Sequence, residues 1–147
     1  MKWIDEIIKV YDQFLKDSFD KLGLVKYQEM DGPGMGALIK FKNNSFKIQI
    51  LNDRGILETE ISSLVGDEQF RGLEMFNSLL RLRQLDNNVS LQERRKILGT
   101  RIDYAGQRDF LMDNQATLIE LLNKDNYERT LKEIDALGQE RFDLQFK

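Results

Sequence analysis

Glu58 and Glu60 are two carboxylate residues whose spacing could support chemistry. They follow the turn sequence Asn52-Asp53-Arg54-Gly55, and two residues at this spacing on a strand point to the same face. Adjacent carboxylates can transfer protons or bind a hard cation. Three lysines are expected on the neighbouring strands: Lys40, Lys42 and Lys47. Cross-strand pairing of these opposite charges is the simplest interpretation, contact with a partner is a second, and catalysis is a third.

The chain has neither cysteine nor histidine, which excludes several kinds of site. Without cysteine there is no disulfide, no thiolate nucleophile and no Cys-ligated metal. Without histidine the commonest general base near neutral pH and the commonest zinc ligand are both missing, so Ser–His and Cys–His catalysis are excluded. Any catalysis would depend on carboxylates, lysine, tyrosine or an oxygen-bound cation. We therefore expect a non-enzymatic protein with no catalytic residue, no cofactor and no metal site.

Length and composition indicate one globular domain over residues 1–147. The chain is 41% hydrophobic and 32% charged, with a net charge of −3, which is typical of a folded protein. No run approaches the ~20 apolar residues that span a membrane. The N-terminus acquires acids at Asp5 and Glu6 and lacks the pattern of a signal peptide, so a cytoplasmic location is expected. The charge gives no reason to expect nucleic acid, and the sequence implies no particular oligomeric state.

Alternating apolar and polar residues predict a β-meander in the first half of the chain. Three such segments are preceded by a fourth and separated from one another by two turn signals: Asn43-Asn44 and Asn52-Asp53-Arg54-Gly55. The antiparallel strands are expected at residues 24–30, 36–42, 45–52 and 55–62. One face of this sheet is expected to be buried, and six residues should belong to the core: Ile39, Phe41, Phe46, Ile48, Ile50 and Ile61.

Glycines mark the connections between these strands. Gly55 is expected to adopt positive φ, in a type I turn followed by a G1 bulge. The Gly-rich run at 32–36 has the composition of a phosphate-binding loop, but a strand follows it where such a loop needs a helix. A plain hairpin connection is the better interpretation of this run.

Apolar spacings of three and four predict helices on both sides of the meander. The expected helices cover residues 3–22, 67–85, 90–123 and 125–138. Asp67 is the expected N-cap of the second, and Ser90 to Glu93 forms a capping box for the third. That third segment is one helix or two, and Gly99 favours a break. The alternating tail at 142–146 predicts an extra strand. The fold class is therefore α+β, an antiparallel three- to four-stranded meander packed on one face by several helices.

Arginines at positions 94, 101 and 108 recur every seven residues. On one straight helix Arg94, Arg101 and Arg108 would share a face and could follow a phosphate backbone. The stretch lacks the interleaved aromatic residues of a stacking platform, so a solvated helix face is the simpler interpretation. The alternative function that this pattern leaves open is a nucleic-acid-associated regulatory protein.

The expected strands at 36–42, 45–52 and 55–62 and the segment after them, about residues 36–85, resemble part of some bacterial toxin-immunity proteins. In those proteins a strand runs into Asp-Arg-Gly, a second strand follows, and a helix opens with aromatic-Asp-Leu. The matching residues here are Ile48–Gly55, then Ile56–Ile61, then Phe70. At the helix start this chain has Phe70-Arg71-Gly72-Leu73 in place of aromatic-Asp-Leu.

The resemblance implies a small cytoplasmic protein that binds one cognate toxin and inhibits it without catalysis. It assigns no site residue, because the binding surfaces of such proteins differ between members. The most distinctive charges on the expected solvent-facing side of the meander are our candidates for contact with a protein partner: Asp53, Arg54, Glu58 and Glu60.

Overall fold

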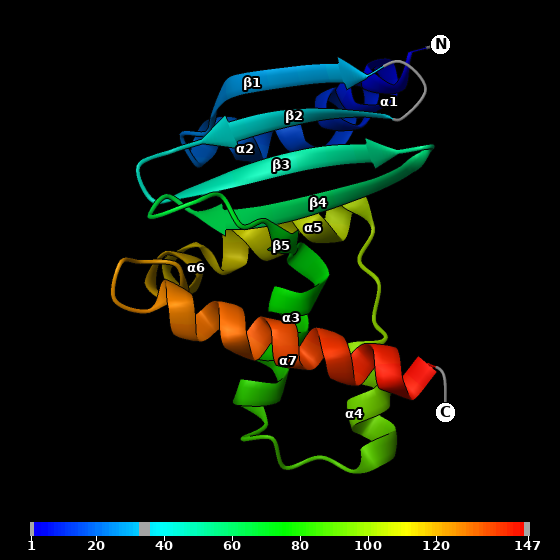
Figure 1. The fold of residues 1–147 in the computed structure, drawn as a ribbon, viewed down its shortest axis with the longest axis vertical. Helices are drawn as coiled ribbons and strands as arrows, with labels where there is room; N and C mark the ends of the chain where they lie inside the picture. Colours follow the sequence, from blue (N-terminus) through cyan, green and yellow to red (C-terminus); the bar gives the residue numbers. More distant parts are fainter. Residues whose placement is uncertain (1, 33–35, 146–147) are drawn as a thin grey trace.

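The predicted meander is present, and a short fifth strand extends it. In the computed structural model, which describes residues 2–32 and 36–145, the sheet order is β1-β2-β3-β4-β5 and every pairing is antiparallel (Figure 1). The strands are β1 (Val25–Gly32), β2 (Gly36–Lys42), β3 (Phe46–Asp53), β4 (Ile56–Ser63) and β5 (Arg71–Gly72). The α+β class and the antiparallel meander are therefore confirmed.

One face of the sheet is buried by the N-terminal helices. These are α1 (Trp3–Val10), a π-helical segment η1 (Tyr11–Leu15) and α2 (Lys16–Lys21). α1 contacts β2 and β3, and both α1 and α2 lie behind the strands in Figure 1. The register places Phe41 opposite Ile48 and Ile48 opposite Ile61, so apolar side chains line up across three strands. All six predicted core residues are buried, as expected.

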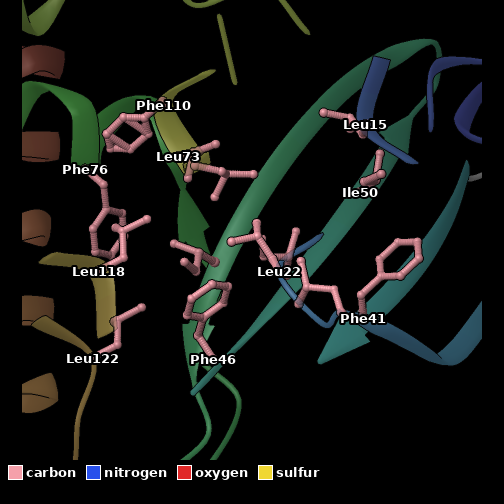
Figure 2. Close-up of a cluster of buried hydrophobic side chains, with 14 of the residues drawn as sticks. Leu15, Leu22, Phe41, Phe46, Ile50, Leu73, Phe76, Phe110, Leu118 and Leu122 are labelled. Atoms are coloured by element: carbon pink, nitrogen blue, oxygen red, sulfur yellow. The ribbon is translucent and has the colours of Figure 1, made fainter. Parts of the chain in front are cut away.

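The other helices lie beyond β4 in the order of the sheet (Figure 1). They are α3 (Leu73–Gln84), α4 (Leu91–Leu98), α5 (Tyr104–Asp113), α6 (Gln115–Leu121) and α7 (Tyr127–Gln145). α7 contacts α3 and α4, while α5 reaches back to contact η1 and α2. A single cluster of buried apolar side chains continues through both parts. Figure 2 follows it from Leu15 and Phe41, through Phe46, to Phe76 and Leu118 between the helices.

Helix caps divide the segment at 90–123 as the sequence favours. Oγ of Ser90 accepts a hydrogen bond from the amide of Glu93 and starts α4. Oδ1 of Asp103 accepts one from the amide of Gly106 and starts α5. Gly99 ends α4 between these two caps, so the predicted break is confirmed. A second break at Asn114, which the spacing did not indicate, separates α5 from α6.

The hairpin between β3 and β4 is tighter than predicted. Asp53 pairs with Ile56, which leaves a two-residue loop in which Arg54 has φ 54° and Gly55 has φ 97°. Two positive φ values are typical of a type I′ turn, so the predicted positive φ of Gly55 is confirmed and the predicted bulge is wrong. Oδ1 of Asn52 accepts a hydrogen bond of 2.8 Å from the Gly55 amide, which holds the loop in this conformation.

Residues 64–70, hereafter the crossing segment, connect β4 to β5. Residues 67–70 of it were predicted to begin a helix, and that prediction is wrong. The chain leaves β4 at Ser63, passes toward Glu68 and forms β5 before α3 begins at Leu73. Asp67 therefore caps no helix. The reason is tertiary, because Glu68 accepts hydrogen bonds from Tyr27 on β1 and Lys40 on β2, which hold the segment over the sheet.

The predicted C-terminal strand is also absent. Residues 142–145 continue α7, and residue 146 of the predicted strand lies outside the described residues. Gly138 does not end α7 as expected, because the packing of α7 on α3 and α4 outweighs the weak helix propensity of one glycine. The Gly-rich connection joins β1 to β2, whose antiparallel pairing of Gly32 with Gly36 confirms a hairpin, while residues 33–35 lie outside the described part.

Candidate functional site

One edge of the sheet, β4, is open over half its length. β5 pairs only with Glu60 and Ile61, so Ile56–Thr59 has no strand on that side within residues 2–32 and 36–145. A cleft of about 310 Å³ lies beside this stretch. Its walls are β4, the first residues of α3 and two arginines, Arg101 and Arg141.

Glu58 and Glu60 both line the cleft, but their surroundings differ. Oε1 of Glu60 accepts a hydrogen bond of 2.6 Å from Nε2 of Gln49 on β3. Glu58 is only partly shielded from solvent and forms no hydrogen bond or ion pair within the described part of the chain. Burial of its carboxyl raises the pKa of Glu58, and the nearby carboxylates of Glu60 and Glu74 raise it further, while Arg101 lowers it. Glu58 is therefore a carboxylate whose charge is incompletely compensated.

The predicted pairing of these glutamates with lysines is wrong. Lys40 lies opposite Gln49 and Gln49 lies opposite Glu60, so β3 separates the two charges by two strand spacings, ~10 Å. Lys40 and Lys47 instead contact Glu68 of the crossing segment, at 2.7 and 3.1 Å. The nearer carboxylate comes from a segment that the sequence pattern assigned to a helix.

Glu68 compensates the positive charges of Lys40 and Lys47 on the side of the sheet away from the N-terminal helices. The Tyr27 hydroxyl donates a hydrogen bond to Glu68, and Nζ of Lys42 lies 5.0 Å from the centre of the Tyr27 ring. Burial alone would raise the pKa of Glu68, but hydrogen bonds from Lys40, Tyr27 and Lys47 outweigh burial and lower that pKa to about 2. Burial and the hydrogen bond to Glu68 raise the pKa of Tyr27. The lysines are thus engaged within the protein, whereas Glu58 is not.

The far wall of the cleft carries a compensated charge. Oε2 of Glu74 lies 3.6 Å from Nη1 of Arg141 and 3.9 Å from Nη1 of Arg101. Oε1 of Glu74 accepts a hydrogen bond of 3.4 Å from the amide of Ile102. Because these two arginines flank Glu74, the uncompensated charge of the cleft belongs to the β4 side. Glu74 and Arg141 were not predicted as site residues, since they come from distant helices and no local pattern marks them.

The other two predicted contact residues lie at the tip of the same hairpin. Asp53 and Arg54 are exposed and form an ion pair of 3.5 Å with each other. Neither is part of the cleft wall. The β3–β4 hairpin therefore carries all four candidates, with Glu58 and Glu60 at the cleft and the other two beyond it.

The three arginines at heptad spacing do not share a helix face. Arg94 is in α4 and binds Glu140 of α7, with Nη2 2.9 Å from Oε1. Arg101 lies in the connection after α4, and Arg108 is in α5, where its Nε lies 3.0 Å from Oδ1 of the adjacent Asp109. The straight helix that the phosphate-tracking pattern requires is broken between Gly99 and Asp103.

Across the described residues, no three acidic side chains are grouped so that they could hold a metal ion. None of the helices in that part of the chain is long and apolar enough to cross a membrane.

Comparison of the chain with protein-family models, with curated proteins and with solved structures gives no match.

Proposed function

We propose that this chain is a non-enzymatic, cytoplasmic binding protein of the immunity type, which inhibits a cognate toxin by occupying its surface. The observation that carries the proposal is the incompletely compensated Glu58 carboxylate at the open cleft beside β4. The residues that resemble immunity proteins, Ile48–Ile61, are the same β3–β4 hairpin that forms one wall of this cleft.

A carboxylate without a partner recognises cations. Partial burial makes the charge of Glu58 costly to hold, and a lysine or arginine from another protein would reduce that cost. Glu60 lies on the same face two residues away, and Asp53 adds a third acid at the tip of the hairpin. A basic surface on the partner therefore complements this hairpin, and such charges act chiefly on the rate of association.

Binding kinetics test the proposal. The partner that co-purifies from the native cell is measured against the wild type and against the double variant Glu58→Lys, Glu60→Lys at two ionic strengths. We expect the double variant to associate at least ~10-fold more slowly at low salt, with a smaller difference at high salt. The double variant Glu29→Lys, Asp31→Lys is the matched control, since it makes the same charge change on β1 at the opposite edge of the sheet.

Equal association rates for the wild type and the double variant would remove the hairpin from the interface. Inhibition of the partner is measured in parallel, because an immunity function requires that the bound partner lose its toxic activity. A partner that stays fully active when bound would contradict the immunity-type role while leaving a binding role.

The cleft also favours a second candidate, an acid–base enzyme that uses Glu58 and Glu60. The specific observation is the raised pKa of Glu58 in a cleft that also contains Arg101 and Arg141. Hydrolysis of a panel of peptides and phosphoesters by the purified chain is the assay. Turnover that disappears in Glu58→Gln would establish this candidate and overturn the non-enzymatic one.

A further inference from the structure

We propose that the open edge of β4 accepts an extended segment of a protein partner as an added strand, with a basic side chain of that segment against Glu58. The inference rests on the proposed function for its partner, and it adds how that partner is held. In this inference the partner is bound by backbone hydrogen bonds along Ile56–Thr59 as well as by the negative charge of Glu58.

The position beside Ile56–Thr59 is where β5 would continue if it were longer. β5 runs antiparallel to β4 opposite Ile61 and Glu60, and the next step along it would lie opposite Thr59. The chain turns away at that point, because Leu73 begins α3. The 310 Å³ cleft occupies this position, with β4 on one side and α3 on the other.

The backbone of this stretch can form a ladder. In an antiparallel strand, alternate residues direct their N–H and C=O groups away from the existing neighbour, here β3. Eight residues of β4, Ile56–Ser63, pair with β3 without a register shift, so the strand is regular up to its open end. An extended peptide can therefore bind by strand addition, in which main-chain hydrogen bonds supply affinity.

The opposite edge of the sheet is less suited to this. β1 pairs with β2 through a register shift between Lys26 and Gln28, and such a bulge bends an edge strand and discourages further pairing. β1 also carries a lysine at the shift. β4 has neither of these features over Ile56–Thr59, so the structure favours β4 as the edge that accepts a strand.

The charge at this edge specifies the occupant. Every second residue of β4 lies on the same face of the strand, which here carries Ile56, Glu58 and Glu60. Ile56 is 64% exposed. An added strand would place its own alternate side chains directly opposite these, where opposite charges attract and like charges repel. The fitting segment therefore has a lysine or arginine opposite Glu58 and an apolar residue opposite Ile56.

Defined peptides test this inference without the natural partner. The probe is a nine-residue Thr/Val peptide with lysine at its centre and blocked ends, titrated into the ¹⁵N-labelled full chain. We expect shifts at the amides of residues 56–60 and an affinity at least ~5-fold above that of the same peptide with glutamate at its centre. Methylation of alternate peptide-backbone nitrogens should abolish binding, because it removes the donors of the ladder.

Two controls identify the mechanism. Glu58→Gln should keep binding of the peptide but remove most of the preference for lysine over glutamate. Glu29→Gln on β1 should leave both unchanged. Absence of binding, binding that tolerates backbone methylation, or shifts confined to β1 would each overturn the inference.

The inference and the proposed function can fail separately. Charge reversal at Glu58 and Glu60 could slow association of the partner while the amides of residues 56–59 exchange hydrogen as fast in the complex as in the free protein. In that case strand addition is wrong and the binding role stands. If the lysine peptide adds to β4 but the partner ignores the charge reversal, the edge accepts strands and the proposed interface is wrong.

Discussion

Replacement of Glu68 by glutamine should destabilise the protein in a manner that depends on pH. Glu68 joins the crossing segment to the sheet. It accepts hydrogen bonds from Lys40 and Tyr27 and forms an ion pair with Lys47. Glutamine has nearly the same shape but no charge, so the change removes the electrostatic part of these contacts. Wild-type Glu68 should come to resemble the variant when it is protonated.

The pKa of Glu68 gives the size of this effect. Its value is lowered from 4.5 to about 2 in the folded protein, and each unit corresponds to about 1.4 kcal/mol, so the upper bound is ~3.5 kcal/mol. The side chain keeps 28% of its surface exposed, and solvent screening reduces the contribution. We expect Glu68→Gln to lose ~1–2 kcal/mol at neutral pH. Because the folded pKa is lowered, this stability is present above the unfolded pKa of 4.5 and is lost as the pH falls toward about 2.

Urea unfolding of both proteins between pH ~7 and pH ~3 measures the difference. The stability gap should be largest at neutral pH and should shrink steadily below about pH 4.5. Glu29→Gln is the control, because the ion pair of Glu29 with Lys26 is exposed and spans 3.4 Å, and its loss should cost less than ~0.5 kcal/mol. A gap that does not change on acidification, or equal stabilities at neutral pH, would refute the argument that the charge of Glu68 holds the crossing segment.

Three further predictions concern the fold and can be measured in the same unfolding experiments. Ile48→Ala should cost ~2–5 kcal/mol because Ile48 is fully buried, whereas Ile56→Ala at the exposed edge should change stability by less than ~0.5 kcal/mol. Gly55→Val should cost more than ~1 kcal/mol, since a β-branched residue is strained at φ 97°, and an unchanged unfolding midpoint would contradict this turn assignment. Gly138→Ala should stabilise the protein by ~0.4–1 kcal/mol, because the added Cβ meets nothing within 4 Å in the middle of α7, and a lower melting temperature would show a hidden constraint there.

The sequence determined the elements whose signals are local. Alternation along the strands, with turn residues between them, defined four strands and the six core side chains, because a strand with one buried face must repeat every two residues. Ser90 marked a helix start for the same reason, since an N-cap bonds an amide three residues away. The shared face of Glu58 and Glu60 also followed from spacing alone.

The tertiary structure decided which side chains meet. Glu68 and Tyr27 are 41 positions apart, and their hydrogen bond turns a segment with a helix-like pattern into an extended crossing. Residues 142–145 of the alternating tail became part of α7, because the contacts of this helix with α3 and α4 outweigh the local pattern. In both places long-range contacts outweighed a weak local preference.

The candidate site divides in the same way. Periodicity placed two carboxylates on one strand, but only the fold placed Glu74, Arg101 and Arg141 across a cleft from them. Of the lysines expected to neutralise Glu58 and Glu60, Lys40 lies on the far side of β3 and Lys47 lies opposite Ser62, and both bind Glu68 instead. Compensation of a charge depends on its distance in space from other charges, and residue spacing along the chain does not give that distance. The incomplete compensation of Glu58 could therefore be recognised only in the folded protein.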